Sequence, residues 1–268
     1  MQLRDAVVVI TGASEGIGAA CAACFAEKGA RLSLNALPGA DFPPGLPDDT
    51  VFTWGDITRD EVRKLLVERT LERFGRIDIL VNNAGVGLYA PPSETPLPLA
   101  ERMFALNVFA PLALAQQVVP VMRRQGGGSV VNVASIGSKV SLPWATLYCA
   151  SKYAIAAISD GLRRELKRSN IHVTTVYPGI VRTRFREHVL AGEAPERVSG
   201  IQRVISPEEC ARAIVRGVER KSRSVVVPKI GYAFAALDRL FPAVMDAYLM
   251  RLDAQQERRV EQASAAQG

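Results

Sequence analysis

The sequence is poor in the residues that build metal centres and disulfide frameworks. Its 268 residues include four cysteines and two histidines, His172 and His188. Neither histidine has the spacing to a second ligand that a catalytic zinc needs. The Cys21-x-x-Cys24 pair falls in an alanine-rich segment, so we interpret it as packing inside a helix. We therefore expect no metal ion and a reducing compartment.

Aromatic residues and long apolar runs are also scarce. Aromatics are 6% of the chain, and its 33 Lys and Arg residues are scattered, so the net charge of +6 does not indicate nucleic-acid binding. No uninterrupted apolar run reaches about 18 residues, and the first residues lack the charged and apolar regions of a signal peptide. The sequence thus predicts a cytoplasmic protein without a transmembrane helix.

Short apolar segments alternate with helical patterns along most of the chain. The predicted strands are residues 6–10, 31–34, 51–54, 79–81, 129–133 and 225–227. Strands joined by helices build parallel sheets, so we predict an α/β protein: a Rossmann-like, doubly wound parallel sheet of about seven strands with helices on both faces. We expect one catalytic domain over residues 1–228. Residues 229–268 should form an apolar helical extension with a frayed polar end after Arg251.

A glycine-rich turn, residues 11–18 (TGASEGIG), joins the first predicted strand to an apolar helix. Glycines let a backbone approach a pyrophosphate, and the helix N-terminus offers free N–H groups. The pattern indicates a dinucleotide site, with a simple tight turn as the alternative. The second strand ends without a charged residue, since position 37 is leucine, so NAD and NADP both stay open. Glu15 would repel a 2′-phosphate, which favours NAD.

Polar residues follow the third and fourth predicted strands. Thr58 and Glu61 have the spacing of a capping box, which would leave Asp56 free to accept a hydrogen bond, for instance from an adenine amino group. A loop carboxylate in water is the alternative. The fourth strand ends in residues 82–85 (NNAG), whose small and amide side chains suit a backbone that passes close to a ligand.

Asn107 interrupts an apolar helical face within the predicted helix 98–124. A buried amide is costly without partners, so Asn107 either bonds a neighbouring backbone or belongs to a site. Pro111 and Pro120 should perturb this helix.

Tyr148 and Lys152 lie four residues apart in a predicted helix, residues 148–167, and so share one face. A nearby ammonium favours the phenolate and lowers a tyrosine pKa from its usual value of about 10. The pair is a plausible acid/base centre, although this spacing also arises by chance. Ser135, thirteen residues upstream, follows a strand.

The ordered set of these motifs resembles the short-chain dehydrogenase/reductase family over roughly residues 5 to 228. The matching positions are residues 11–18, Asp56, residues 82–85, Asn107, Ser135, Tyr148, Lys152, Pro178, Gly179 and Thr183. The resemblance implies hydride transfer between a nicotinamide cofactor, NAD or NADP, and an alcohol or carbonyl. It makes Tyr148 the general acid/base. Lys152 would lower the pKa of the Tyr148 phenol and hold the nicotinamide ribose. Ser135 would hold the substrate oxygen, and Asn107 a proton-relaying water.

The resemblance also assigns the binding residues. Those expected at the cofactor are Gly12, Ser14, Gly16, Ile17, Gly18, Asp56, Ile57, Asn83, Ala84, Gly85, Lys152, Pro178, Gly179, Ile180 and Thr183. Those expected at the substrate are Leu88, Tyr89, Leu142, Trp144 and Phe185, within a wider set that includes Gly87, Ser141 and residues 185–198. The set is mostly apolar, which predicts a lipophilic or bulky substrate rather than a charged sugar.

The extension after residue 228 carries a long apolar stripe broken at Pro242. It either packs on the protein or a dimer partner, or lies on a membrane, aided by a basic stripe of Arg212, Arg216 and Arg220. Relatives pair the helices equivalent to 98–124 and 148–167, so a homodimer or homotetramer is expected. A dinucleotide-sensing scaffold and a membrane-surface lipid-handling protein are the competing functions; the intact catalytic set favours the enzyme.

Overall fold

The computed structural model describes residues 2–192 and 203–265. Its strands form one seven-stranded parallel sheet, as the sequence predicts, and their order is β3-β2-β1-β4-β5-β6-β7. The strands are β1 (Val7–Thr11), β2 (Arg31–Ala36), β3 (Val51–Trp54), β4 (Ile79–Asn82), β5 (Gly128–Val133), β6 (Ile171–Pro178) and β7 (Ser224–Val227). The order reverses between β1 and β4, so this is the point where a crevice opens at the carboxyl ends of the strands.

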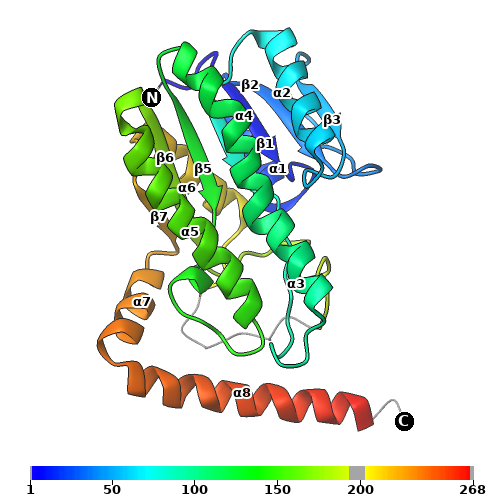
Figure 1. Ribbon diagram of the computed structural model, residues 1–268, viewed down its shortest axis with the longest axis vertical. Helices are drawn as coiled ribbons and strands as arrows, with labels where there is room; N and C mark the ends of the chain where they lie inside the picture. The colour runs from blue at the N-terminus through cyan, green and yellow to red at the C-terminus, as the bar shows by residue number, and fades with distance from the viewer. Residues whose placement is uncertain (1, 193–202, 266–268) are drawn as a thin grey trace.

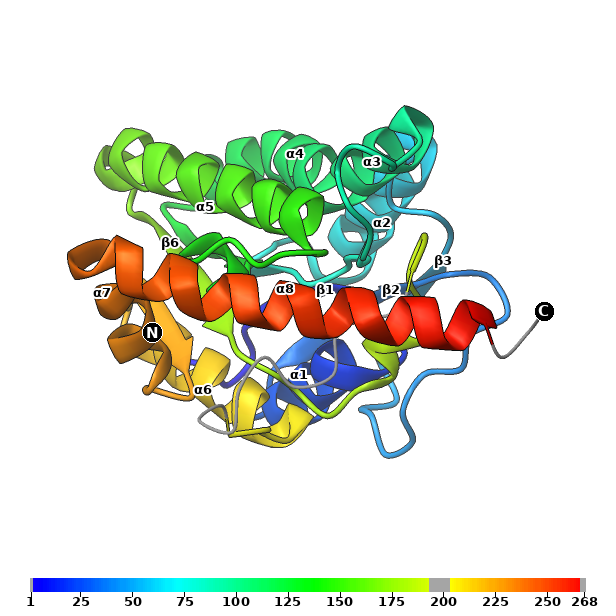
Figure 2. The same ribbon diagram turned by 90° about the horizontal axis from the view of Figure 1, so that it is seen from below.

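Helices cover both faces of the sheet, which gives three layers (Figures 1 and 2). The helices are α1 (Gly16–Ala26), α2 (Asp60–Phe74), α3 (Leu97–Phe104), α4 (Ala110–Arg124), α5 (Thr146–Leu166), α6 (Pro207–Glu219), α7 (Gly231–Leu240) and α8 (Pro242–Ala265). One apolar core lies between the sheet and α1 with α6, and a second lies between the sheet and α2 with α4. Both faces are therefore buried, which explains why most strands read as continuous apolar runs.

The strand that the sequence pattern did not reveal is β6. Its Thr174 and Thr175 interrupt the apolar run, although both side chains are fully buried. The Thr174 hydroxyl donates a 2.7 Å hydrogen bond to the carbonyl of Ser222, so the polar group has a partner inside the fold. Buried polar groups that are paired in this way are tolerated within a core strand.

A π-helical turn, η1 (Ala105–Phe109), joins α3 to α4. Pro111 has no N–H, and in a regular helix its ring would press against the carbonyl of Asn107. The extra residue of the π turn relieves this conflict, since the N–H of Ala110 bonds the carbonyl of Ala105. The expected perturbation at Pro111 is confirmed, whereas Pro120 lies inside α4 without ending it.

The continuous segment Leu97–Arg124 is long and apolar enough to cross a membrane by length and composition, with a mean hydropathy of 1.5 over its most apolar window. This differs from the expectation drawn from uninterrupted runs. In the structure 44% of that window is buried, and Leu114, Val118 and Met122 pack beneath the sheet. That is the placement of a core helix.

Two local predictions are wrong. Thr58 does not cap α2, which begins at Asp60; instead Thr58 donates to Asp56 Oδ1 through both its backbone N–H, at 2.9 Å, and its hydroxyl, at 2.8 Å. Oδ1 of Asp56 thus takes part in a local turn. The residues after Arg251 are helical up to Ala265 rather than frayed.

The C-terminal helices lie beyond the carboxyl ends of the strands, where α8 runs across the bottom of the molecule (Figure 1). The predicted break at Pro242 is confirmed, because α8 begins there. Met245 and Leu249 of α8 are buried against Val140, in a small cluster that Leu142 and Tyr248 flank. Part of the apolar stripe therefore packs on the protein itself.

Candidate active site

A cleft of about 1200 Å³ opens at the carboxyl ends of the strands, on both sides of the β1/β4 switch point. All the predicted cofactor residues except Gly18 line it. Ser135, Tyr148 and Lys152 line it, as do Tyr89, Leu142 and Phe185 from the predicted substrate set. The topology thus gathers residues as far apart in the sequence as Gly12 and Phe185.

Of the wider predicted pocket, the cleft wall lacks Gly87, Ser141, Glu187, Val189, Ala191 and Gly192. Four residues of the narrower predicted set also lie outside the wall of this cleft. Leu88 is fully buried in the core, and Asn107 is buried behind the loop after β4. Trp144 has a left-handed backbone, φ +63°, in a loop that turns Leu142 toward the cleft instead. Gly18 packs against the glycine turn. Residues 193–198 of the wider predicted pocket lie outside the described residues.

The glycine turn has the backbone of a phosphate cradle. Gly12 and Gly16 have φ values of +63° and +56°, in the left-handed region that side chains disfavour. A Cβ on Gly18 would lie 2.0 Å from the carbonyl oxygen of Gly12, so only glycine lets α1 approach the turn so closely. These constraints fit a pyrophosphate at the start of α1.

Asn83 and Thr11 clamp the glycine turn to the end of β4. The Asn83 side-chain amide donates 3.0 Å hydrogen bonds to the carbonyls of Thr11 and Gly12. In return, Thr11 Oγ1 accepts from the backbone N–H groups of Asn83 and Ala84, both at 3.1 Å. The sequence analysis places Thr11 in the glycine-turn motif of residues 11–18 but gives it no role of its own.

Asn107 fixes the loop that follows β4. Its Oδ1 accepts from the backbone N–H of Val86, and its Nδ2 donates to the Val86 carbonyl, both at 2.9 Å. Nδ2 also donates to Ser151 Oγ at 3.0 Å. A Cβ on Gly85 would lie 3.1 Å from Asn107 Oδ1 and 3.3 Å from Lys152 Nζ, so glycine at 85 lets these two side chains approach. The backbone-bonding alternative for Asn107 is what the structure shows.

Lys152 is buried, and its Nζ donates a 3.0 Å hydrogen bond to the carbonyl of Val133 at the end of β5. The ammonium lies 5.8 Å from the centroid of the Tyr148 ring. Burial lowers the pKa of Lys152 to about 8, because few groups compensate its charge. The residue is therefore poised to change protonation near neutral pH.

Burial raises the pKa of Tyr148 well above its usual value, and Tyr89 adds to the rise, while a hydrogen bond with Ser135 acts in the opposite direction. The predicted lowering of the Tyr148 pKa by Lys152 is wrong for the protein alone, because burial of the phenol dominates. The Tyr148 ring lies 6.2 Å from that of Tyr89 and 6.0 Å from that of Phe185, centroid to centroid. These rings form apolar walls on either side of the phenol.

A buried polar chain, which sequence reasoning missed, orients α5 on the sheet. Asn82 Nδ2 donates to Asn132 Oδ1 at 2.8 Å, and Asn132 Nδ2 donates to Ser159 Oγ at 2.8 Å. The three residues come from β4, β5 and α5, and all are buried. Two asparagines at matched positions of neighbouring buried strands were the available signal.

The segment after β6 crosses the cleft and contacts both of its sides. His188 Nε2 lies 3.1 Å from Glu15 Oε1, and Arg184 lies 3.7 Å from the other oxygen of Glu15. Farther along, the N–H of Leu190 bonds the carbonyl of Gly87 at 3.0 Å. Because Glu15 faces two basic side chains, its repulsion of a 2′-phosphate is weaker than its sequence position suggests.

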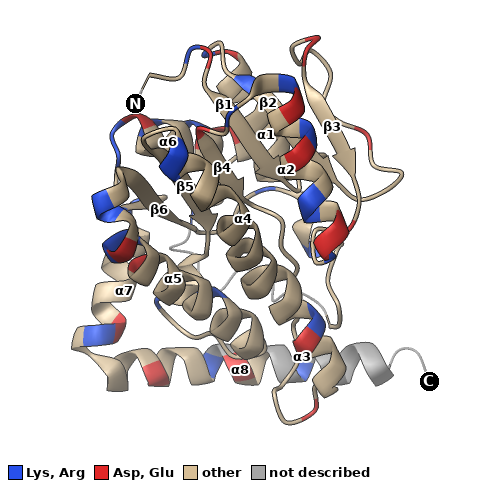
Figure 3. Ribbon diagram, turned by 45° about the horizontal axis from the view of Figure 1, so that its top comes forward, with Lys and Arg blue, Asp and Glu red and all other residues tan. Residues whose placement is uncertain are grey.

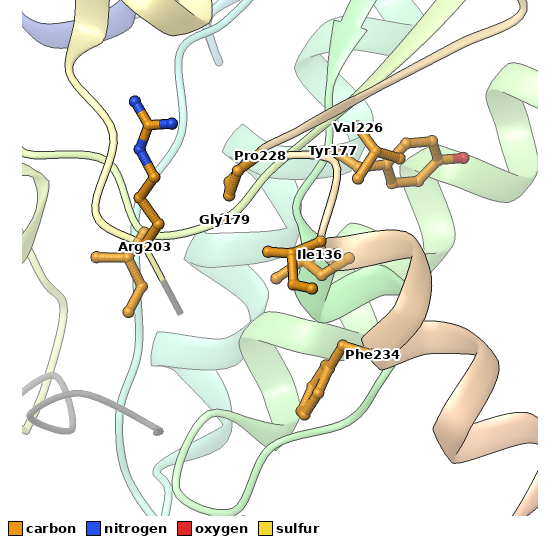
Figure 4. Close-up of a pocket in the computed structure, with 10 residues that line it drawn as sticks. Ile136, Tyr177, Gly179, Arg203, Val226, Pro228 and Phe234 are labelled. Carbon is orange, nitrogen blue, oxygen red and sulfur yellow. The ribbon is translucent and has the colours of Figure 1, made fainter. Parts of the chain in front are cut away.

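A much smaller apolar pocket, of about 30 Å³, lies behind the cleft between the ends of β6 and β7 and the first turns of α7 (Figure 4). Ile136, Gly179 and Ile180 border both spaces. That volume accommodates about one water-sized group, so we assign it no ligand. Within the described residues, no cluster of three His, Cys, Asp or Glu side chains could hold a metal ion.

Comparisons with known proteins agree with this geometry. The model of the short chain dehydrogenase family matches residues 6–194. An uncharacterized oxidoreductase of Staphylococcus saprophyticus is 33% identical over 232 residues, which cover 84% of this chain and 94% of that protein. Dehydrogenase/reductase SDR family member 7B of Danio rerio is 31% identical over 259 residues, which cover 90% of this chain and 84% of that protein.

Two crystal structures of short-chain dehydrogenases superpose on most of the chain. One, from Burkholderia cenocepacia in complex with NADP, has a TM-score of 0.79 at 25% identity and covers 93% of this chain and 99% of its own. The other, from Burkholderia phymatum in complex with NAD, has a TM-score of 0.78 at 21% identity and covers 91% and 96%.

The chain therefore belongs to the short-chain dehydrogenase/reductase family. It is an oxidoreductase of the class that acts on CH–OH and C=O groups with a nicotinamide cofactor.

Proposed function

We propose that the protein transfers a hydride between a nicotinamide cofactor and a lipophilic or bulky alcohol or carbonyl, with Tyr148 as the general acid/base. The observation that carries this proposal is the position of the Tyr148 phenol. It lines the cleft beside Ser135 and Lys152, between the rings of Tyr89 and Phe185.

Each side chain has one part in this reaction. A bound nicotinamide would supply or accept the hydride. The Tyr148 hydroxyl donates a proton to the substrate oxygen in reduction and accepts it in oxidation, and a pKa raised by burial keeps it protonated and ready to donate. Ser135 holds the substrate oxygen, and Lys152 holds the nicotinamide ribose.

Asn107 acts as a positioning residue in this scheme. Its side chain is occupied by Val86 and Ser151, so it keeps the loop after β4 in place beside Lys152. The relay water that the family resemblance assigns to Asn107 stays a prediction. Such a water would have to bind a group of the π turn other than the Asn107 side chain, such as a backbone carbonyl.

The apolar wall supports a lipophilic substrate. Tyr89, Leu142 and Phe185 surround the substrate side of Tyr148, and burial raises the pKa of Tyr89 to about 12, so its phenol is uncharged there. A bulky ketone fits such a wall because apolar contact and ring stacking supply its binding free energy.

The test is a panel of aliphatic, aromatic and steroid-like ketones, with small charged keto acids as the contrast. The oxidation of NADH or NADPH is the signal that reports turnover. We expect turnover of the bulky ketones, and a Ser135→Ala variant should lose at least about 100-fold in kcat. Turnover confined to the charged acids would contradict the substrate class. No turnover, with nucleotide still bound, would favour a dinucleotide-sensing scaffold.

NAD is our preferred cofactor. Leu37, at the end of β2, is 62% exposed and offers no cation to a 2′-phosphate. Glu15 contributes less than its sequence position suggests, since Arg184 and His188 face it. Equilibrium titration with NADH and NADPH tests the preference directly.

A second proposal concerns a cytoplasmic membrane surface. Leu237, Leu240, Phe241 and Val244 are all exposed, by 42 to 69%, at the junction of α7 and α8 and at helical spacing. Such a face suits the interfacial region of a bilayer. The basic stripe of Arg212, Arg216 and Arg220 is exposed on α6 and its C-cap. Both signs of charge occur along α7 and α8 (Figure 3).

Flotation with liposomes tests this contact. The full chain should float with anionic liposomes, and a Leu240→Asp/Phe241→Asp double variant should not. If both stay in the soluble fraction, the membrane proposal is wrong, while the oxidoreductase proposal is unaffected.

A homodimer or homotetramer is the third part of the proposal. Phe109, the last residue of the π turn before α4, is 59% exposed, and Tyr153 of α5 is 40% exposed. The two helices lie side by side on one face of the molecule (Figures 1 and 2). Large exposed apolar side chains on neighbouring helices are typical of a surface that another subunit covers.

A further inference from the structure

Three basic side chains of the segment after β6 line the cleft. They are Arg184, Arg186 and His188, and all three are exposed. Phe185, from the same stretch, lies beside Tyr148 on the substrate side, with 6.0 Å between the two ring centroids. The segment therefore brings positive charge to the part of the cleft where the proposed reaction takes place.

Two of these three basic side chains face carboxylates. Arg184 Nε donates a 2.9 Å hydrogen bond to Glu187. The two carboxylate oxygens of Glu15 lie 3.7 Å from a terminal nitrogen of Arg184 and 3.1 Å from Nε2 of His188. Arg186 forms no ion pair with any carboxylate in the described part of the chain. It is therefore the unbalanced cation of this segment.

The backbone that carries Arg186 is held in a short turn. This 3-10 turn, η4, covers Arg184–Arg186. Thr183 caps it, since its hydroxyl oxygen accepts a 3.3 Å hydrogen bond from the N–H of Phe185. At the other end the N–H of Glu187 bonds the carbonyl of Arg184 at 2.8 Å. Because the turn is fixed, only side-chain freedom is lost when Arg186 binds a ligand.

Arg186 lies close enough to Tyr89 to interact with it electrostatically. Burial raises the pKa of the Tyr89 phenol to about 12, and the positive charge of Arg186 opposes this rise. The backbone brings the two segments together, since the N–H of Tyr89 bonds the carbonyl of Ala191 at 3.0 Å. The Tyr89 ring lies 6.2 Å from that of Tyr148, centroid to centroid. A guanidinium thus stands beside one of the rings that enclose the Tyr148 phenol.

We propose that Arg186 binds a carboxylate of the substrate, so that the preferred substrate is a bulky oxo acid or hydroxy acid. Such a molecule has an apolar body and an anion remote from its reacting carbon. The inference rests on the proposed function and narrows its substrate class. A planar guanidinium pairs with both oxygens of a carboxylate, and the pair strengthens where a bound substrate excludes water. Small keto acids lack the body that would fill the wall of Tyr89, Leu142 and Phe185.

A second cation of the cleft makes a competing prediction. Arg102 of α3 also lines the cleft and is exposed. If Arg102 received the carboxylate, its loss, and not the loss of Arg186, would abolish a preference for acids. The two arginines belong to different elements, so single substitutions separate them.

The experiment compares aryl oxo acids with their own methyl esters. Benzoylpropionate and benzoylbutyrate each contain a bulky ketone, and they place the carboxylate at two different distances from it. The esters keep the body and remove the charge. We would measure kcat and KM for all four compounds with the full chain and with whichever of NADH and NADPH it binds more tightly.

Four variants locate the residue responsible. Arg186→Gln removes the charge, and Arg186→Glu reverses it. Arg102→Gln tests the competing cation. Arg182→Gln is the matched control, because Arg182 is an exposed arginine of the same segment that does not line the cleft. Circular dichroism spectra verify that each variant is folded.

We expect kcat/KM of the unmodified protein to be about tenfold higher for at least one acid than for its ester, which corresponds to one charge-assisted interaction. Arg186→Gln should abolish this preference, and Arg186→Glu should reverse it. The change should appear in KM, with kcat within about twofold, because the carboxylate binds away from the reacting carbonyl. Arg102→Gln and Arg182→Gln should keep the preference.

Equal kcat/KM for acid and ester in the unmodified protein overturns the inference and leaves the proposed function intact. The same holds for a preference that Arg186→Gln retains or that Arg102→Gln abolishes, and for a protein that reduces other bulky ketones but none of the acids. If the unmodified protein reduces no ketone at all, the proposed function itself fails, and that outcome is distinguishable from the others.

Discussion

The side-chain amide of Asn107 pairs with the backbone of Val86 through two hydrogen bonds of 2.9 Å each. The amide continues the hydrogen bonding of β4 beyond its last residue and holds the loop against the π turn between α3 and α4. The same amide reaches Ser151 of α5. One side chain therefore connects the loop after β4, the π turn and the helix that carries Tyr148.

Asn107→Ala should lower the free energy of unfolding by about 2 to 4 kcal/mol, because it leaves buried N–H and C=O groups of Val86 without partners. Urea unfolding measures this loss. Asn107→Asp keeps the acceptor for the Val86 N–H and removes the two donated bonds, so it separates the two halves of the pair. An Asn107→Ala variant as stable as the unmodified protein would contradict the role we assign to the pair.

Thr11→Val should weaken dinucleotide binding at least about fivefold, since valine has the same shape but cannot accept hydrogen bonds from Asn83 and Ala84. Thr11→Ser keeps the hydroxyl and is the control. Titration with NADH compares the two. If valine and serine bind NADH equally well, the clamp between β1 and β4 does not shape the cofactor site.

Lys152 makes stability depend on pH above neutrality. Its pKa is lowered to about 8 by burial, from an ordinary value of 10.5, so the folded state binds its proton less well than the unfolded state. The resulting destabilisation, about 3 kcal/mol, is complete below about pH 8 and disappears as pH rises toward 10.5. Unfolding curves of the unmodified protein and Lys152→Met, measured from pH 7 to 10, isolate this contribution.

We expect Lys152→Met to gain stability relative to the unmodified protein at pH 7 and to lose that advantage by about pH 10. If the difference in unfolding free energy between the two proteins is constant over this range, burial does not disfavour the charged form of Lys152.

Phe109→Glu should dissociate the proposed oligomer, because it places a charge in an apolar contact between subunits. Light scattering coupled to size-exclusion chromatography measures the mass. Leu65→Glu, at another exposed apolar position on α2, is the control and should keep the oligomer. A monomer in the unmodified protein contradicts the proposal at once.

The sequence was sufficient for the elements whose apolar pattern coincides with their burial. Strands such as β1 are continuous runs of apolar residues, and helices such as α5 are periodic in them. The sequence motifs lie at the ends of these elements, and the topology brings those ends together. The pattern failed at β6, where Thr174 and Thr175 are buried with their hydroxyls paired, because such pairing depends on a tertiary neighbour.

The candidate site was predictable where the chemistry is local to a motif and less so where it depends on distant contacts. Ser135, Tyr148 and Lys152, which the family resemblance assigns to the site, line the cleft. The raised pKa of Tyr148 was not predictable, since burial depends on the rings of Tyr89 and Phe185.

The central claim is that the Tyr148 hydroxyl transfers the proton that accompanies hydride transfer. The most direct measurement is the turnover of Tyr148→Phe with a bulky ketone and NADH, alongside its dissociation constant for NADH. The account predicts that kcat falls by at least about 1000-fold while the dissociation constant stays within about twofold of that of the unmodified protein. Turnover retained at its full rate would contradict the account.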